Sequence, residues 1–381
     1  MKNTRMDREI NPGNANVFVP LLIIAAAPQA SSMRSKHTHS ATMHSRRTVN
    51  ETLICRMELQ QLMIPFATPA LGFIQPHSRL FFSGSCFGAS MYAAASKAGF
   101  QSFYGPCGIV FNPLAMAKGF RRMLDELPYE SDDLMYDGAL YHSFDHHSSF
   151  SGTDALQVLD GLNQARTAAR TALTAADVLL ISFGTAWYYT LRHNGNIVAN
   201  NHKQPAAWFN RQLASAVEIV ASWKQCMEDF RVLNPRLKVC FAVSPVKYLK
   251  DGLVEHNRSK AALITAVHEL CAQVPDVYYF PSYEILVDVL RDYRWYAEDM
   301  AHPSAQATSI IWNAFLKAWM SEEALNFERA TREYRKLCSH KVRFPETAAA
   351  QKHAQQLSAL QAQLIQKYPH LRDGNEWMRA D

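Results

Sequence analysis

The stretch RLFFSGSCFGASM, residues 79–91, indicates the fold, because an apolar run stops at Gly-Ser-Cys and a helix-like segment follows. The run RLFFS is nearly continuous in apolar character, which is typical of a strand buried on both faces. After the turn, apolar residues recur at helical spacing, at Phe87, Met91, Ala94 and Ala98, and Gly99 suits a C-terminal cap. The stretch therefore predicts a strand over 79–83, a tight turn and a helix over 87–98.

Four further segments, rich in β-branched and aromatic residues, also predict strands. They cover residues 100–104, 177–183, 237–243 and 277–280. Helices are expected between them, most clearly over 155–172, 214–233 and 260–273. Strands that alternate with helices form a parallel sheet with helices on both faces. The sequence therefore predicts a three-layer α/β/α fold.

The composition fits a globular protein, since 48% of the 381 residues are hydrophobic and 19% are charged. The formal charge of +5 comes from 39 basic and 34 acidic residues, and much of the excess lies in the first fifty positions. The body of the chain is near balance, which argues against nucleic acid as a partner. Seven cysteines form no C-x-x-C pair. This usage indicates a reducing compartment, so we expect a cytoplasmic location.

The N-terminal segment contains an apolar run, VFVPLLIIAAA, over residues 17–27. It has the length of a signal-peptide core and is too short to span a bilayer, so we expect no stable membrane insertion. Asp7, Glu9 and Pro20 argue against export. A signal peptide in residues 1–30 nevertheless stays open as an alternative.

Composition divides the chain into three parts. Residues 1–56 are predicted to be a disordered or non-native extension, because 34–50 lacks acids and has almost no large apolar residue. Residues 57–320 form the α/β domain, in which 129–163 is expected to be a loop excursion over the edge or mouth of the sheet. Residues 321–381 form a polar helical tail that packs on the domain or on a second subunit.

Ser85 and Cys86 directly follow the first predicted strand. In doubly wound sheets, ligands bind beyond the carboxyl ends of the strands, and Gly84 permits the tight turn required there. The helix dipole and any nearby imidazolium are expected to lower the pKa of the Cys86 thiol, which makes it a candidate nucleophile. Two structural alternatives stay open: Ser85 caps the helix, and Cys86 packs as a small buried thiol.

The segment YAEDMAHPSA, residues 296–305, places Asp299 three residues before His302. At a loop-to-helix junction, this carboxylate can accept the Nδ1 proton and leave Nε2 as a base. A nucleophile after the first strand and a base before the last helix would meet at one edge of such a sheet. We therefore predict that Cys86 approaches His302.

Several sequence blocks occur in order along the chain. They are GSCF at 84–87, FNP at 111–113, SFDHHSSF at 143–150, GTAW at 184–187, NNHKQP at 200–205, VSPV at 243–246, DGLVEHNRSK at 251–260, and FPSYEI through LRDYRWYAEDMAHP at 280–303. Together they resemble the GSCFA family, collinearly from about Leu80 to Trp319. The resemblance implies similarity to the SGNH, or GDSL-like, hydrolases, with a flavodoxin-like three-layer fold and a Ser-Asp-His triad that acts on esters.

Carried over to this sequence, the resemblance puts Cys86 in the nucleophile's place, with Ser85 beside it as the alternative. Asp299 and His302 fall on the family's Asp-x-x-His block. Gly108 corresponds to the glycine whose N–H helps hold the oxyanion.

The resemblance also shows one departure. Gly184, a third candidate for the oxyanion site with Gly108 and Asn112, begins the block that normally reads Gly-x-Asn, but here the block reads Gly-Thr-Ala. Losing one oxyanion donor can cost about a hundredfold or more in rate. A substitute donor could come from Asn112, Asn200 or His202, whose alternative role is loop hydrogen bonding.

The sequence therefore favours a hydrolase or acyltransferase that acts on a small-molecule or carbohydrate ester through a Cys/Ser-His-Asp triad, without a cofactor. His147, His202 and Lys203 are candidates for substrate contact. Aromatic residues are candidates for the pocket wall, although core packing explains them equally well. These are Phe144, Trp187, Tyr188 and Trp295.

Two other functions stay open. A catalytically silent binding module would keep the fold and the pocket, and the missing asparagine favours it. Metal-assisted hydrolysis would use His142, His146 and His147 with Asp145, but these residues lack a regular ligand spacing on one element.

Overall fold

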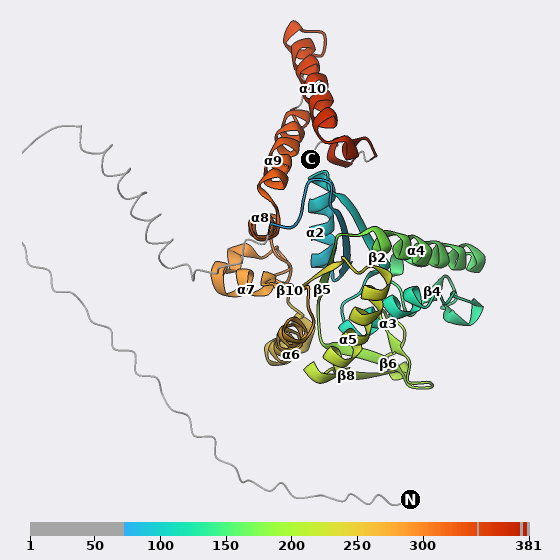
Figure 1. Ribbon diagram of the computed structural model, residues 1–381. Helices are drawn as coiled ribbons and strands as arrows, with labels where there is room; N and C mark the ends of the chain where they lie inside the picture. Colours follow the sequence, from blue (N-terminus) through green and yellow to red (C-terminus); the bar gives the residue numbers. More distant parts are fainter. Residues whose placement is uncertain (1–71, 341–342, 374–375, 379–381) are drawn as a thin grey trace, which may run out of the picture. The chain divides into compact units, whose positions relative to one another are not determined.

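The computed structural model describes residues 72–340, 343–373 and 376–378 (Figure 1). The predicted extension over 1–56, its apolar run and the expected start of the domain at residue 57 lie outside these residues. Within the described residues, no helix has the length and apolar character needed to cross a membrane.

The central sheet has five strands in the order β10-β9-β5-β1-β2, and every neighbouring pair is parallel. The strands are β1 Arg79–Gly84, β2 Gln101–Ile109, β5 Val178–Phe183, β9 Lys238–Val243 and β10 Val277–Phe280. Counted along the chain from the β2 edge, this order is 2-1-3-4-5, the flavodoxin-like order. All five predicted strands are confirmed. The strand order reverses at β1, which places the turn after β1 at the switch point where such sheets bind ligands.

Alternate residues of the strands enter two separate apolar cores, one on each face of the sheet. On one face, Phe81, Ile181 and Phe241 pack against α3 Pro113–Leu124, α4 Ala155–Ala175, α5 Ala216–Leu233 and α6 Gly252–Gln273. On the other face, Phe82, Leu180 and Cys240 pack against α2 Cys86–Lys97 and α8 Ala305–Trp319. Figure 1 shows these layers. The predicted three-layer α/β/α fold is confirmed.

Side-chain caps fix where two helices beside the switch point begin. Asn112 Oδ1 accepts the Ala115 N–H at 2.7 Å, with Pro113 at the first helical position of α3. Ser304 Oγ accepts the Ala307 N–H at 3.2 Å at the start of α8. These caps hold the chain segments that carry Asn112 and His302.

The expected loop excursion over 129–163 contains more structure than the sequence predicted. It holds an antiparallel hairpin of β3 Leu134–Tyr136 and β4 Tyr141–Ser143. A second sheet, also unpredicted, joins β6 Trp187–Leu191 to β7 Ile197–Val198 and β8 Phe209–Leu213. These strands have only two to five residues, and β4 and β8 are largely polar, so they lack the long apolar runs that revealed the central sheet.

The C-terminal tail contains α9 Glu322–Cys338 and α10 Ala348–Lys367. It packs at the end of α2, where the Phe327 ring meets Phe100 edge-on at 5.1 Å and Thr331 Oγ1 donates to the Ala98 carbonyl at 2.8 Å. Gly99 has a φ of 91°, and a Cβ there would lie 2.9 Å from Leu371. Of the two alternatives, the structure therefore shows the tail on the α/β domain. After β10, α7 Ser282–Glu284 and a π-helical turn over Ile285–Leu290 lead toward α8.

Candidate active site

The turn after β1 requires glycine. Gly84 has a φ of 125°, and a Cβ at this position would lie 2.2 Å from the Ser182 carbonyl oxygen of β5. The Ser85 N–H donates to that same oxygen at 2.9 Å. The close contact with β5 sets Cys86 at the first turn of α2.

Ser85 is buried, with 1% of its surface exposed. Its side chain makes no capping hydrogen bond, so that alternative is wrong. Instead, Ser85 Oγ lies 2.8 Å from Ser182 Oγ beneath the turn. The Ser85 hydroxyl therefore lacks the solvent access that a nucleophile needs.

Cys86 is half-buried, and its Sγ lies 3.5 Å from His302 Nε2. Burial raises the pKa of the Cys86 thiol above its ordinary value, although the backbone N–H groups of Cys86 and Phe87 act to lower it. The expected lowering of this pKa is therefore wrong, because desolvation outweighs the start of the helix. The resting thiol is protonated at neutral pH and needs a base.

His302 Nδ1 lies 2.5 Å from Asp299 Oδ2. Asp299 Oδ1 accepts the His302 N–H at 2.9 Å and the Ala301 N–H at 3.0 Å. These backbone bonds, with the bond to the imidazole, lower the pKa of Asp299 to about 2. Met300 adopts a left-handed φ of 56° within this tight turn. Because Nδ1 faces the carboxylate, Nε2 faces the sulfur.

The Asp299 turn is tied to the sheet and open to solvent. The Lys247 N–H, in the segment after β9, donates to the Ala301 carbonyl at 2.9 Å. The side chains of His302 and Asp299 are 49% and 50% exposed. A large substrate can therefore reach the imidazole.

Gly108 lies where the register of β1 and β2 shifts, beyond the pair Phe82 and Tyr104. Its φ is 72°, and a Cβ there would lie 2.9 Å from His147 Cβ. Asn112 is buried, and its Oδ1 is used by the α3 cap. Its Nδ2 has no hydrogen-bond partner among the residues that the structure describes. Gly108 thus lies near the carboxyl end of β2, and Asn112 lies just beyond that end.

The Gly184 N–H is not free to bind an oxyanion, because it donates to the Phe111 carbonyl at 2.8 Å. Ala186, where the resemblance would place asparagine, is fully buried, and its N–H donates to Ser259 Oγ at 2.8 Å. The Gly184 N–H therefore cannot act as an oxyanion donor, and the prediction that Gly184 supplies one is wrong. The backbone N–H groups of this block instead bond Phe111, in the segment after β2, and Ser259 of α6.

His202 and Lys203 lie in the second sheet's connections and make no described contact with Cys86 or His302. His202 is buried, packs against the His142 ring with the ring centres 4.5 Å apart, and bonds the Ser143 carbonyl through Nε2 at 2.8 Å. Burial lowers its pKa. Lys203 is exposed with a φ of 58°. Asn200, the third candidate substitute donor, accepts the His202 N–H at 3.0 Å. These positions fit loop hydrogen bonding.

His147 lies nearer to the candidate site. Its backbone N–H donates to the Cys107 carbonyl at 3.0 Å, which holds it beside Gly108. Its Nδ1 accepts the Ser149 N–H at 3.2 Å. A role for His147 in substrate contact stays a prediction.

Three of the four aromatic candidates pack elsewhere. Phe144 contacts the Phe209 ring at 5.9 Å, Trp187 lies under the Arg211 guanidinium at 3.9 Å, and Tyr188 donates to Gln212 at 3.0 Å. Only Trp295 adjoins the Asp299 turn, because its carbonyl accepts the Ser304 N–H at 2.8 Å. Core packing is therefore the correct interpretation for Phe144 and Tyr188, whereas Trp187 packs against Arg211 outside the apolar cores.

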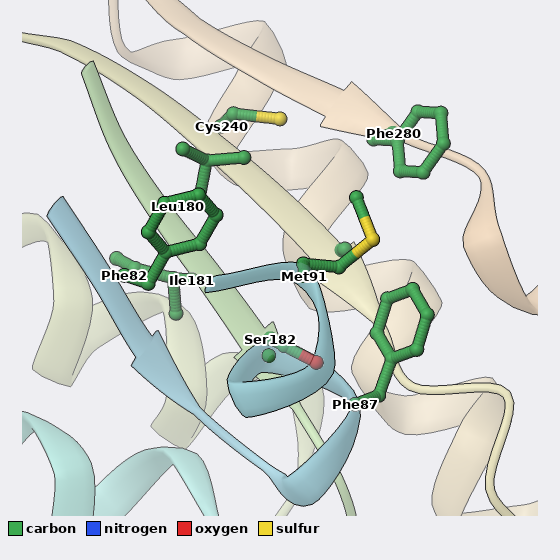
Figure 2. A pocket seen from close by; sticks show the side chains of 10 residues that line it. Phe82, Phe87, Met91, Leu180, Ile181, Ser182, Cys240 and Phe280 are labelled. Atoms are coloured by element: carbon green, nitrogen blue, oxygen red, sulfur yellow. The ribbon is translucent and has the colours of Figure 1, made fainter. Parts of the chain in front are cut away.

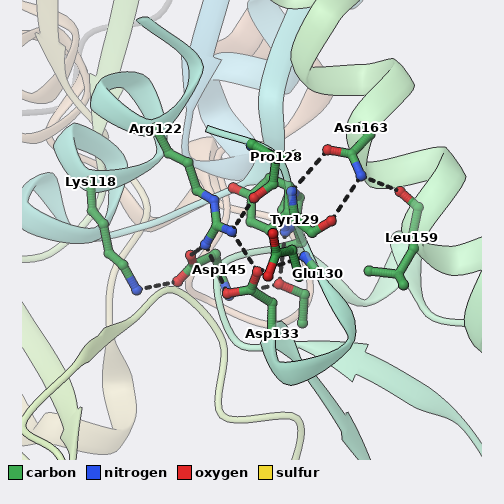
Figure 3. A network of polar contacts seen from close by, with 11 residues as sticks. Lys118, Arg122, Pro128, Tyr129, Glu130, Asp133, Asp145, Leu159 and Asn163 are labelled. Carbon is green, nitrogen blue, oxygen red and sulfur yellow. Dashed lines mark hydrogen bonds and ion pairs between the residues drawn. The ribbon is translucent and has the colours of Figure 1, made fainter. Parts of the chain in front are cut away.

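The residues of the suggested metal site point to different partners. His142 bonds Asp137 and Ser151, whereas His146 bonds Ser143. Asp145 pairs with Lys118 at 2.6 Å, within the polar network of Figure 3. Within the described ranges, no group of three His, Cys, Asp or Glu residues could hold a metal ion. The spatial arrangement contradicts the metal alternative.

A small apolar cavity lies behind α2. It measures about 20 Å³ and is lined by Phe87, Met91 and Phe280 among others, with Ser182 beneath the turn (Figure 2). This space fits about one water molecule and cannot take an acyl chain. Neither Cys86 nor His302 lines this cavity, so it is not an acyl pocket beside the thiol.

The sequence interpretation missed Lys260 of α6. Its side chain is 1% exposed, and its ammonium donates to the carbonyls of Gly184 at 2.7 Å and Ser244 at 2.6 Å. Burial lowers the pKa of Lys260 to about 7. Lysines in helices are usually exposed, so only the position of Lys260 within the block DGLVEHNRSK could have signalled it.

The sheet order, the turn at its switch point and the Cys-His-Asp arrangement define an α/β protein of the flavodoxin-like class with a candidate thiol site. Residues 79–315 match the GSCFA family, and the chain belongs to that family. The resemblance seen in the sequence is thus confirmed. No curated protein matches the chain.

Solved structures resemble the chain weakly. A family two carbohydrate esterase from Clostridium thermocellum is 12% identical with a TM-score of 0.33, and the match covers 69% of this chain and 67% of that one. A carbohydrate esterase family 3 from Talaromyces cellulolyticus is 10% identical with a TM-score of 0.31, covering 62% and 94%. The periplasmic domain of a lipopolysaccharide acetyltransferase from Salmonella ser. Paratyphi A is 10% identical with a TM-score of 0.29, covering 72% and 95%. At such TM-scores, these likenesses support no conclusion about the substrate.

Proposed function

We propose that this chain is an acyl-ester hydrolase or acyltransferase in which Cys86 is the nucleophile. One observation carries the proposal: Cys86 Sγ, His302 and Asp299 form a continuous chain of contacts, at 3.5 Å and 2.5 Å, at the switch point of the sheet. Ser85 is the weaker candidate because it is buried and bonded to Ser182.

In the proposed reaction, His302 Nε2 takes the thiol proton as Cys86 Sγ attacks the ester carbonyl carbon. Asp299 holds the imidazole and stabilises the imidazolium that forms. The tetrahedral intermediate collapses when the alkoxide leaves and takes the proton from His302, which gives a thioester on Cys86. Water or an acceptor alcohol then attacks the thioester, with His302 again as base, and the thiol is restored.

The intermediate carries a negative oxygen that needs hydrogen-bond donors. The N–H of Cys86 at the start of α2, the N–H of Gly108 and the Nδ2 of Asn112 are the proposed donors. The raised pKa of the thiol fits this scheme, because His302 removes the proton during the attack instead of holding a resting thiolate.

We propose a carbohydrate-borne ester as substrate because the site is open. His302 and Asp299 are about half exposed. On the same segment, Tyr293 is 70% exposed, and the Lys247 ammonium lies 5.4 Å from its ring. An exposed aromatic ring beside a cation can hold a polar carrier while the acyl group reaches Cys86.

The full chain should be assayed with p-nitrophenyl acetate, with and without a chelator. Turnover that is chelator-insensitive, lost in C86A and H302A, and retained in the control C271A supports the proposal. A trapped acyl group on Cys86, found by mass spectrometry, would identify the nucleophile. If S85A alone abolishes turnover, the assignment to Cys86 is wrong. An absence of turnover in the unmodified protein would instead favour the silent binding module.

A further inference from the structure

The proposed oxyanion site is incomplete on the β5 side. The Gly184 N–H is bonded to Phe111, and Ala186 is buried against Ser259. The block that follows β5 therefore offers no donor from these two positions. A donor on this side must come from a neighbouring segment.

Tyr248, in the segment after β9, reaches this position. A Cβ on Gly184 would lie 3.1 Å from Tyr248 Oη and 3.1 Å from the Phe111 carbonyl oxygen. The phenol oxygen therefore lies against the glycine, between the ends of β9 and β5, on the side where Phe111 precedes Asn112. Any side chain at position 184 would crowd this hydroxyl.

The Tyr248 ring is held in place from two directions. It meets the Phe111 ring edge-on at 5.9 Å, and the Tyr248 backbone N–H donates to His256 Nδ1 at 3.3 Å. Its hydroxyl, however, has no hydrogen-bond partner among the residues that the structure describes. A positioned hydroxyl without a protein partner can donate to a ligand.

The electrostatic surroundings keep this hydroxyl protonated. Burial, and then the charge of a Cys86 thiolate, raise the pKa of Tyr248 well above its ordinary value. The backbone places Tyr248 at the same site, because the N–H of the preceding residue, Lys247, donates to the Ala301 carbonyl beside His302 at 2.9 Å. Tyr248 can therefore donate a hydrogen bond over the whole pH range in which an esterase works.

Lys260 holds the backbone where β5 and β9 end, beside Tyr248. Its ammonium bonds the carbonyls of Gly184 and Ser244 and lies 6.0 Å from the centre of the Tyr248 ring. No ion pair between Lys260 and a carboxylate occurs in the described part of the chain, and burial lowers the pKa of Lys260 to about 7. Lys260 is thus a positioning residue that holds the Gly184 and Ser244 carbonyls.

We propose that the Tyr248 hydroxyl donates a hydrogen bond to the oxyanion formed at Cys86 and replaces the side-chain amide that the block at 184–186 lacks. This inference rests on the proposed acyl-transfer function. It makes Tyr248 a catalytic residue that acts when the carbonyl oxygen becomes negative.

The test compares two reactions of the same sulfur in Y248F. Acylation by p-nitrophenyl acetate builds an oxyanion, whereas alkylation by iodoacetamide at a saturated carbon does not. We expect the rate of Cys86 acylation to fall about 100-fold, as for the loss of one oxyanion donor. We expect alkylation at the same pH to stay within about twofold. Y188F is the matched control, since it removes a hydroxyl bonded to Gln212 in the second sheet.

Each outcome of this comparison supports or overturns the proposed role of Tyr248. Unchanged acylation in Y248F overturns the role of Tyr248. Equal losses of acylation and alkylation overturn it too, because they indicate a structural role. If the unmodified protein shows no Cys86-dependent acylation, the proposed function itself fails, and circular dichroism of the same sample separates that result from an unfolded preparation.

Discussion

Among the residues that the structure describes, two hydrogen-bonded relays join an Asp, a His and a side chain with a nucleophilic atom. One joins Asp299, His302 and Cys86. The other is a local relay in which His142 Nε2 lies 2.9 Å from Asp137 Oδ2 and its Nδ1 lies 2.7 Å from Ser151 Oγ. In both, the carboxylate accepts two backbone N–H groups, and its pKa falls to about 2.

The two differ in how they are built and in what can reach them. His302 meets a residue 216 positions away and is half exposed, whereas His142 meets Ser151 only nine positions away and is 6% exposed. The His142 ring also packs against the His202 ring, with the ring centres 4.5 Å apart. The comparison teaches that hydrogen-bond connectivity does not define a catalytic site. Access and position at the switch point of the sheet distinguish the two, so we interpret the Asp137 relay as a tie between the β3–β4 hairpin and the start of α4.

The largest expected effect separates the two nucleophilic atoms. C86A should lower esterase turnover by at least about 10³-fold, because the covalent route is lost. S151A should leave turnover within about twofold, because Ser151 only bonds His142. Initial rates with p-nitrophenyl acetate at one pH compare both variants. A large loss in S151A would show that the local relay is catalytic and would overturn the comparison.

The two histidines should show the opposite pattern in stability. H142A removes a buried ring with two hydrogen bonds, so the free energy of unfolding should fall by about 2–3 kcal/mol. H302A removes an exposed ring and should change it by less than about 0.5 kcal/mol while turnover is lost. Urea denaturation followed by circular dichroism measures both. Equal destabilisation by the two variants would contradict the distinction between a structural and a catalytic histidine.

The central sheet could be predicted because β1, β5 and β9 are short apolar runs buried on both faces. The second sheet could not, because β7 has two residues and β8 exposes Asn210, Arg211 and Gln212. Neither pattern differs from that of a loop. Strands that pair outside the main core can be assigned only from the three-dimensional structure.

The residues of the candidate site also fall into those that the sequence could predict and those that it could not. The Asp299–His302 pair depends on a local turn, and Cys86 follows a strand, so spacing alone pointed to all three. Gly184 was assigned wrongly as a donor because the bond to Phe111 is tertiary. Lys260 and Tyr248 were missed because their burial at the end of the sheet depends on packing that no local pattern encodes.

The smallest expected effect is one that both relays share. Asp137 and Asp299 each have a pKa of about 2, below the ordinary 3.8, so each stabilises the fold above about pH 4 and loses that contribution as the pH falls toward 2. D137N and D299N should each make the melting temperature less sensitive to pH across this window, and neither should change its slope above pH 5. Differential scanning calorimetry at several pH values measures the slopes. An unchanged slope in D299N alone would mean that its turn opens before the fold does, which would extend the contrast between an accessible site and a buried tie to their unfolding.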